Sequence, residues 1–479
     1  MLLASMVALL LVRLIALRGN ATDLFFDEAQ YWSWSQEPAF GYYSKPPLIA
    51  WVIRLSTDAC GLSEFCIRLP SPLFHAATAF VIFAVAARLY DARTGFWAAL
   101  AFATLPGVSF SAGIISTDVP LLFAWGLALW AYVALAQGRS WLPVLGLGLA
   151  IGIGLNAKYA MAYFALCVAV DMIATRDRRH LLRDARLWVA LAFGIALIAP
   201  NLLWNASNKF ATFSHTADNA KWTGSLIHPL KALECFATQF GVFGPILFAG
   251  LLVIVVRAYR QGVPSADRLL LAFALPVLAV VTVQAFLSRA HANWAAVSYV
   301  AAVILVVATM IRDLSWTWLK ASLALHLALL AGFGLAAASA GQFKLPGIED
   351  PFARTLGWKE VATETRGLLA DARKAGQPFA AVITDERALS AELLYYMRDE
   401  PTPVLAWRAG AKPADHYELT RPFTAATTGR VLLVAMRRDT SPITGRFKSA
   451  QQIAVKSLPA GRNSTRAYSF HAVEGYSGP

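Results

Sequence analysis

The chain has 479 residues, of which 57% are hydrophobic and only 15% are charged. Soluble globular domains usually carry about 25% charged residues, so this composition excludes an ordinary soluble protein and indicates one that faces lipid. The formal net charge of +13 does not indicate nucleic-acid binding, because the lysines and arginines collect in short segments between apolar runs. That distribution is typical of the loops of membrane proteins.

The apolar residues gather into about eleven runs, each long enough to cross a hydrocarbon core about 30 Å thick as a helix. The first run is predicted to be a span rather than a signal peptide, because no basic segment precedes it and no A-x-A site follows it. The predicted spans lie near residues 2–18, 70–88, 95–115, 119–136, 141–157, 159–175, 187–205, 236–256, 268–287, 293–311 and 316–339.

Two short basic loops orient these spans. Residues 175–186 read TRDRRHLLRDAR and residues 256–268 read VRAYRQGVPSADR, and loops of this kind stay in the cytoplasm. Counting spans from them predicts a cytoplasmic N-terminus and a C-terminus outside. Most polar residues of chemical interest then lie on the outer face, in segments near 19–69, 116–118, 158, 206–235 and 288–293.

The composition changes near Gly341, where prolines and charged residues become frequent. Short apolar pieces at 379–384, 431–436 and 452–455 are typical of strands, and residues 387–398 have the pattern of an amphipathic helix. The sequence therefore predicts an α-helical polytopic membrane domain over 1–340, with an outer loop at 19–69, and a soluble extracytoplasmic α/β domain over 341–479.

The cysteines indicate no metal site. The four cysteines form no C-x-x-C pair and have no histidine near them in the sequence; they are Cys60, Cys66, Cys167 and Cys235. Zinc is therefore not implied. No cofactor is predicted, although a divalent metal stays open. Cys60 and Cys66 fall in the outer loop, where oxidation is possible, and a short disulfide there is one alternative.

The outer loop carries Asp27 and Glu28 beside the aromatic residues Tyr31 and Trp32. Asp27 has Gln30 three residues later, an arrangement that caps the start of a helix. Two carboxylates beside aromatic rings are also what sugar transfer needs, namely a base and stacking surfaces. The residues alone leave both interpretations open.

Two lysines on the predicted outer face are candidates to bind a lipid phosphate as point charges. Lys45 precedes two prolines that stiffen the backbone, and Lys158 lies at the turn between two short spans. The alternatives are a solvated turn for Lys45 and a snorkelling side chain for Lys158. An ionisable residue at membrane depth favours a functional role for Lys158.

Two further groups complete the candidates. Asp118 follows a threonine at the start of a predicted span, a pattern that helix capping alone explains. Arg289, His291 and Asn293 share one outer turn. The alternative for that turn is a polar loop next to an interfacial tryptophan.

Five motifs occur in order along the chain. They are D-E-A-x-Y-W from Asp27, G-Y-Y-x-K-P-P-L from Gly41, T-D-x-P-L-L-F from Thr117, G-x-G-L-x-x-K ending at Lys158, and H-A-N-W from His291. Together they resemble the GT-C membrane glycosyltransferases of the protein O-mannosyltransferase type, especially the bacterial relatives that include the lipid A aminoarabinose transferases. Those transferases have a glutamate directly before the K-P-P lysine, whereas this chain has Ser44. Because of this difference, the resemblance is weaker evidence that the chain shares their sugar specificity or a metal site that uses the glutamate.

The resemblance implies an inverting transfer from a polyprenyl-phosphate sugar, on the periplasmic face of a bacterial inner membrane, to lipid A, lipopolysaccharide, another glycan or a protein. By motif position, Asp27 corresponds to the catalytic base with Glu28 as its neighbour, and Asp118 to a second active-site carboxylate. Lys45 and Lys158 correspond to the lysines that contact the carrier phosphate. The remaining candidates for substrate binding are Tyr43, Arg289, His291 and Asn293.

The main alternative function is a transporter or flippase of a lipid-linked or anionic substrate. A transporter should carry charges near the middle of the bilayer, in helices interrupted at matching positions of two halves, whereas the candidates here line one face. A lipid-phosphate hydrolase is a second alternative, but its usual nucleophile or metal constellation is not evident. No motif selects among sugars, acceptors or oligomeric states.

Overall fold

The structure is a computed structural model, and it describes residues 1–220, 222, 226–342 and 350–478. The chain divides into two compact units. Unit 1 comprises Met1–Arg18, Lys45–Val52 and Arg68–Leu335, and unit 2 comprises Gly19–Ser44, Ile53–Ile67 and Ala336–Pro479. Most of the outer loop therefore groups with the C-terminal domain. The predicted domain boundary at 340/341 adjoins residues 343–349, which lie outside the described residues.

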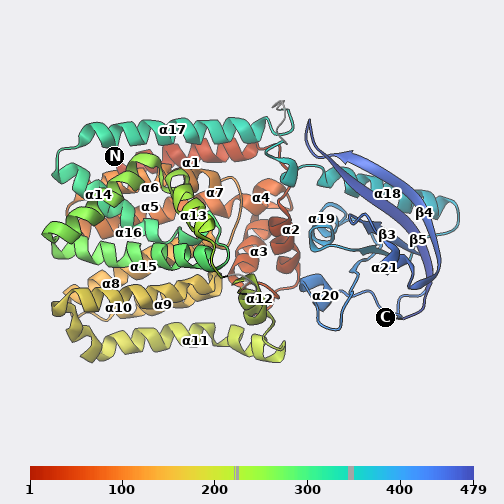
Figure 1. Ribbon diagram of the computed structural model, residues 1–479, viewed down its shortest axis with the longest axis horizontal. Coiled ribbons are helices and arrows are strands. Elements are labelled where there is room, and N and C mark those ends of the chain that lie inside the picture. The colour runs from red at the N-terminus through yellow and green to blue at the C-terminus, as the bar shows by residue number, and fades with distance from the viewer. Residues whose placement is uncertain (221, 223–225, 343–349, 479) are drawn as a thin grey trace. The chain divides into compact units, whose positions relative to one another are not determined.

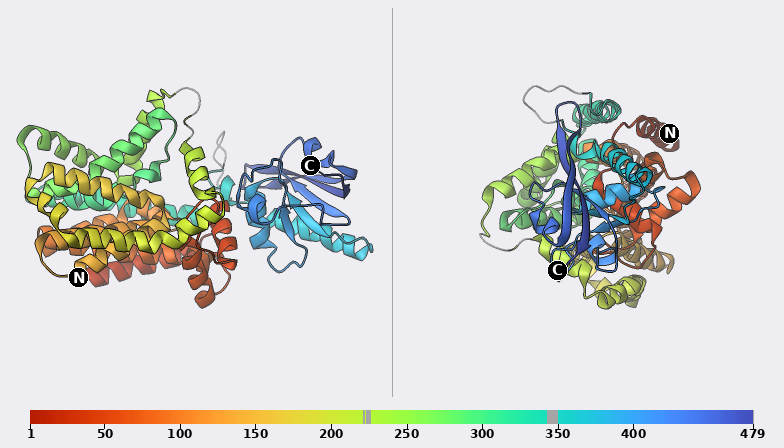
Figure 2. Two further views of the ribbon diagram at one scale, coloured as in Figure 1. Left: turned by 90° about the horizontal axis from the view of Figure 1, so that it is seen from below. Right: turned by 90° about the vertical axis from the view of Figure 1, so that its right-hand side faces the viewer.

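Unit 1 is a bundle in which the long helices run side by side (Figures 1 and 2). Short 3-10 helices connect some of them, namely η1 (Tyr159–Ala162), η2 (Arg176–Arg183) and η3 (Ala292–Ala295). The α-helices are α1 (Leu2–Arg18), α5 (Pro70–Leu89), α6 (Ala92–Thr104), α7 (Pro106–Ser111), α8 (Asp118–Gln137), α9 (Leu142–Ala157), α10 (Tyr163–Ala174), α11 (Ala185–Ser207), α12 (Ala211–Ala220), α13 (Pro229–Phe243), α14 (Pro245–Gln261), α15 (Ser265–Leu287), α16 (Ser298–Arg312) and α17 (Trp316–Ala338). The residues of α3 (Leu48–Cys60) are divided between the two units.

Several of these helices are long and apolar enough to cross a membrane, which makes the chain a multi-pass membrane protein. They are Glu64–Leu89, Asp118–Gln137, Ala185–Ser207, Ser265–Leu287 and Trp316–Ala338, and each coincides with a predicted span. Other predicted spans fall on shorter apolar helices, namely Leu142–Ala157, Tyr159–Ala174 and Ser298–Arg312. The total of about eleven spans stays a prediction.

The predicted spans at 236–256 and 95–115 are each divided between two α-helices, so neither is one continuous helix. The run at 236–256 is divided between α13 and α14, which meet at an angle of 117°. The break falls at Gly244, whose φ is +88°, and Pro245 follows it. Glycine adopts a positive φ readily, and proline cannot continue the preceding helix. The run at 95–115 breaks before Pro106, after α6 has ended at Thr104 and with Leu105 extended at a ψ of 140°.

Buried carboxylates hold the loops that are predicted to be cytoplasmic. Asp171 pairs with Arg178, and Asp267 pairs with Arg312 at 2.8 Å. Asp171 also accepts a hydrogen bond from Tyr132 of α8, and Asp267 accepts one from Tyr90, the residue that follows α5. Loss of one partner would leave a buried charge uncompensated, which typically costs about 3–5 kcal/mol, so these pairs have a structural role.

Unit 2 contains a five-stranded sheet with the order β2-β1-β3-β5-β4. The central strands pair in parallel, and β4 and β5 form a long antiparallel hairpin that curves past them (Figures 1 and 2). The strands are β1 (Ala381–Thr384), β2 (Val404–Ala406), β3 (Val431–Ala435), β4 (Phe447–Pro459) and β5 (Thr465–Tyr476). The helices are α2 (Phe26–Gln36), α4 (Glu64–Arg68), η4 (Ala353–Thr355), α18 (Trp358–Lys374), α19 (Arg387–Tyr396), α20 (His416–Thr420) and α21 (Ser441–Thr444).

The sequence predicted the centre of this sheet better than its margins. Strands β1 and β3 and helix α19 lie where the apolar pattern predicted them, and every residue of β1 and β3 is buried. Such continuous apolar runs are typical of strands covered on both faces. The predicted strand at 452–455 is only the middle of β4, because nearly all of β4 is exposed and therefore polar. No prediction covered β2 or β5.

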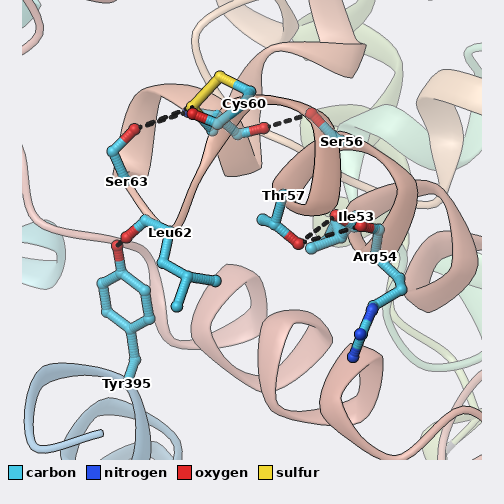
Figure 3. The surroundings of a disulfide bond; sticks show 9 residues. Ile53, Arg54, Ser56, Thr57, Cys60, Leu62, Ser63 and Tyr395 are labelled. Atoms are coloured by element: carbon cyan, nitrogen blue, oxygen red, sulfur yellow. Dashed lines mark hydrogen bonds between the residues drawn. A yellow bond between two sulfur atoms is a disulfide. The ribbon is translucent and has the colours of Figure 1, made fainter. Parts of the chain in front are cut away.

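Cys60 and Cys66 form a disulfide, the alternative that the sequence left open. Figure 3 shows the loop that this disulfide closes after α3. The carbonyl of Leu62 in this loop accepts a hydrogen bond from the hydroxyl of Tyr395 at 3.2 Å, and Tyr396 donates to Glu64 at 2.6 Å. The bridged loop is therefore bonded to α19, and both belong to unit 2.

Candidate functional site

Three of the candidate residues form one hydrogen-bonded cluster in unit 1. The ammonium of Lys158 lies 2.6 Å from Oδ1 of Asp118, and the amide of Asn293 donates to Oδ2 of the same carboxylate at 2.7 Å. The side chains of Lys158 and Asp118 are largely buried. The ion pair thus has little water around it, and charges in such surroundings interact more strongly than they do in bulk solvent.

The cluster forms where three helices begin or end. Asp118 is the first residue of α8, and its carboxylate bonds to Lys158 and Asn293, so helix capping does not account for it. Lys158 follows α9 in an extended conformation, and Asn293 lies in η3. The glycines before Lys158 allow close packing, because a Cβ at Gly152 would come within 2.5 Å of Leu197. The motif therefore brings α9 against α11.

A second polar group of unit 1 adjoins Lys158 in sequence, and none of the five motifs includes it. The hydroxyl of Tyr159 donates to Asn201 at 2.6 Å and accepts from Asn205 at 3.2 Å. Both asparagines are fully buried on α11. The signal was present, since two amides four residues apart inside an apolar run lie on one helix face.

The other candidates of unit 1 each have surroundings of their own. Arg289 makes a long hydrogen bond of 3.5 Å to Asn219, and its buried Nε has no partner among the described residues. The ring of His291 lies edge-on to Trp294, with centroids 5.4 Å apart. Lys45 lies partly exposed in the turn before α3. Arg289 therefore retains donors for an anionic ligand.

Asp27 does not cap α2, so the structure does not support the capping alternative. The N-cap of this helix is Phe25, and its backbone N–H donates to the carboxylate of Glu28 at 2.9 Å. A glutamate at the third helical position commonly reaches back in this way. Glu28 is almost fully buried, so it stabilises the start of α2, and the carboxylate of Asp27 is left for another partner.

That partner is Arg387, the first residue of α19. Its Nη1 lies 2.8 Å from Oδ1 of Asp27 and also donates to Oε1 of Gln30 at 2.8 Å. Burial on its own would lower the pKa of Arg387, but the charge of Asp27 and its hydrogen bond outweigh it, and the pKa is raised. Arg387 stands 360 residues from Asp27 in the chain, and no sequence motif indicated the pairing.

Aromatic side chains support α2 on another face. Trp34 stacks on Tyr42 with centroids 4.6 Å apart, and His416 lies edge-on to both rings. Tyr43, a candidate for substrate binding, is buried and donates its hydroxyl to the carbonyl of Pro413 at 2.9 Å. Tyr43 therefore connects the outer loop to the C-terminal domain within unit 2.

The buried His416 predicts a loss of stability in acid. Burial, together with the charge of Arg421, lowers its pKa to about 3, whereas histidine in an unfolded chain titrates near 6.5. Between these two pKa values the imidazole of His416 is therefore protonated in the unfolded chain but stays neutral in the folded protein. The free energy of unfolding is unaffected by His416 above about pH 7 and falls as the pH drops below 6.5. At pH 5 the titration of His416 lowers it by about 2 kcal/mol.

Thermal unfolding of the detergent-solubilised protein at pH 7.5 and pH 5 measures this effect. The variant His416→Phe has no titrating ring, so its midpoint temperature should fall less between the two pH values than that of the wild type. Equal falls in both proteins would contradict the assignment.

The candidate residues thus form two groups, one in each unit. Asp118, Lys158 and Asn293 meet in unit 1, to which Lys45, Arg289 and His291 also belong, whereas Asp27, Glu28 and Tyr43 belong to unit 2. Within the described ranges, no three His, Cys, Asp or Glu side chains are grouped so that they could hold a metal ion.

Comparisons with known proteins agree with the motifs. A family model described as dolichyl-phosphate-mannose-protein mannosyltransferase matches residues 44–204. The chain is 38% identical to the lipid A galacturonosyltransferase RgtD of Rhizobium johnstonii over 424 residues, which is 88% of each protein. It is 26% identical to the lipopolysaccharide core galacturonosyltransferase RgtA of the same organism, over 52% of each.

A solved structure has the same fold. ArnT from Cupriavidus metallidurans, bound to undecaprenyl phosphate, aligns with a TM-score of 0.66 at 18% identity and covers 100% of this chain and 99% of that one. The resemblance predicted from the five motifs is confirmed, and the extent of the match to RgtD decides the family. The chain belongs to the GT-C membrane glycosyltransferases of the protein O-mannosyltransferase type and is related to ArnT.

Proposed function

We propose that this glycosyltransferase moves a galacturonic acid residue from a polyprenyl-phosphate carrier to a hydroxyl group of lipid A. The sugar and the acceptor are proposed from the extent of the match to RgtD, and the carrier from ArnT with its bound undecaprenyl phosphate. Ser44 agrees with a sugar other than aminoarabinose. One observation supports the proposed reaction: Asp118, Lys158 and Asn293 come from three separate motifs, and their side chains form one hydrogen-bonded cluster.

The first chemical requirement is to stabilise the leaving group. As the bond from the anomeric carbon to the phosphate oxygen breaks, its electron pair stays on the phosphate, and fixed cations in a site sheltered from water stabilise that charge. Lys158 suits this role because Asp118 holds its ammonium in place through one of its three donors. We assign Lys45 to the same phosphate, and Arg289, His291 and Asn293 to substrate binding.

The second requirement is to activate the acceptor. A bond forms between the acceptor oxygen and the anomeric carbon on the face opposite the leaving phosphate, so the configuration inverts, and the hydroxyl proton must go to a base. We assign this base to Asp27, whose side chain is 37% exposed. A positioned carboxylate commonly contributes about 10² to 10⁴ in rate.

We assign these steps to the periplasmic face of the bacterial inner membrane, with a cytoplasmic N-terminus and a periplasmic C-terminal domain. The Cys60–Cys66 disulfide supports this orientation, because disulfides persist in oxidising compartments. The chain belongs to the glycosyltransferase family, and no observation favours the alternative functions of a transporter or a hydrolase.

Mass spectrometry of lipid A from cells with and without the gene tests the acceptor and the sugar. We expect one uronic acid per molecule to be lost on deletion and restored by the wild-type gene but not by Asp27→Asn. Unchanged lipid A together with an altered core or another glycan would overturn the proposed acceptor. An added sugar that is not a uronic acid would overturn the proposed donor.

A further inference from the structure

The candidate base is held by the C-terminal domain. One oxygen of Asp27 accepts a hydrogen bond from Arg387, and the other has no partner among the described residues. The same guanidinium nitrogen also donates to Gln30, one turn further along α2. Arg387 thus bonds to two side chains of one helix face, which fixes both its own position and that of Oδ1.

Two arginines of the C-terminal domain surround the start of α2. The guanidinium of Arg387 lies 4.9 Å from the ring centre of Phe26, and that of Arg354 lies 5.0 Å from the ring centre of Phe25. Both rings precede Asp27 directly. Arginine stacks on aromatic faces through its delocalised plane, which lysine lacks, so the first turn of α2 depends on arginine at these positions.

We propose that Arg387 is a positioning residue for the reaction, through which the C-terminal domain takes part in catalysis. Its hydrogen bond fixes Oδ1 of Asp27 and leaves the second oxygen to receive the acceptor proton. A base held in this way needs no reorganisation at the moment of reaction. The inference rests on the proposed function, because it requires Asp27 to be the base.

The ordinary alternative is that Arg387 merely stabilises the packing of unit 2. The chain offers a matched control, because Arg421 of the same domain pairs with Glu37 at the other end of α2. The variant Arg421→Gln removes an ion pair on the same helix without touching Asp27. A packing role predicts similar losses from Arg387→Gln and Arg421→Gln, whereas a positioning role predicts a loss only from Arg387→Gln.

The experiment measures kcat and KM of the full-length protein in detergent, with polyprenyl-phosphate galacturonic acid as donor and lipid A as acceptor. For Arg387→Gln we expect kcat to fall by about 10- to 100-fold, with the KM for the donor within about twofold of wild type. Arg387→Lys should restore part of kcat, because charge survives without the planar fork. Arg421→Gln should stay within about twofold of wild type.

A double variant tests whether Arg387 acts through Asp27. Asp27→Asn with Arg387→Gln should be no slower than Asp27→Asn alone, because residues that act as a unit are not additive. Wild-type kcat in Arg387→Gln, equal losses in Arg387→Gln and Arg421→Gln, or additive losses in the double variant would each overturn the inference. A wild-type rate in Asp27→Asn alone would instead overturn the assigned base, so the two failures are distinguishable.

Discussion

Replacement of Asp27 by asparagine should lower the rate of sugar transfer by at least about 100-fold at normal abundance in the membrane. The fold should survive, because Glu28 and not Asp27 accepts the hydrogen bond from the N-cap residue Phe25. The asparagine carbonyl can still accept the hydrogen bond from Arg387 that Oδ1 of Asp27 accepts. What asparagine lacks is the ability to take the acceptor proton. Initial rates in membranes normalised to protein amount measure the effect.

Glu28→Gln is the paired control. Glutamine retains a side-chain oxygen to accept from the backbone N–H of Phe25, so the start of α2 persists. We expect a smaller loss than in Asp27→Asn. If Asp27→Asn transferred sugar at the wild-type rate, the base would have to be sought elsewhere, with Asp118 the next carboxylate to test.

Replacement of Lys158 by alanine is the second change with a large expected effect. Loss of a fixed cation that meets developing negative charge typically costs about 10² to 10³ in rate, and we expect a loss of this order. The substitution also leaves Asp118 without its ion-pair partner in a largely buried place, which destabilises a protein by itself. Activity must therefore be compared at equal amounts of folded protein.

The double variant Lys158→Ala with Asp118→Asn separates the two effects. It removes the uncompensated charge, so folding should recover, while transfer should stay below that of Asp118→Asn alone if the ammonium acts on the phosphate. Recovery of transfer to the wild-type rate would mean that Lys158 serves only to neutralise Asp118.

Lys45 gives a parallel test at a partly exposed position. Lys45→Ala should impair use of the donor, and Lys45→Arg should keep part of the activity, because the charge survives while its geometry changes. Saturation curves in the donor measure both. Normal turnover in Lys45→Ala would leave the solvated turn as the interpretation of this residue.

Local sequence predicted those features of the candidate site that depend on one helix end or one turn. Asp118 at the start of a helix, Lys158 at a turn and Asn293 in a polar turn were each identified from their own segments. The motifs did not indicate that these residues bond to one another. Their meeting depends on how the helices pack, and close approaches such as that of Gly152 to Leu197 set this packing.

The features that no local sequence pattern indicated have specific physical causes. The break between α13 and α14 lies within an apolar run. The hydropathy of the sequence does not reveal it, because the helices before and after the break are both apolar. Asp27 and Glu28 are both good residues for the first turn of a helix, so composition could not decide which one caps α2. The pairing of Arg387 with Asp27 joins segments 360 residues apart, beyond the reach of any local pattern.

The proposed transfer can be measured with the purified protein in lipid vesicles, supplied with polyprenyl-phosphate galacturonic acid and lipid A. We expect transfer of one galacturonic acid to lipid A with inverted anomeric configuration and release of polyprenyl phosphate, and we expect Asp27→Asn to abolish both. Transfer with retained configuration, or release of the carrier phosphate without any glycosylated lipid A, would contradict the proposed function.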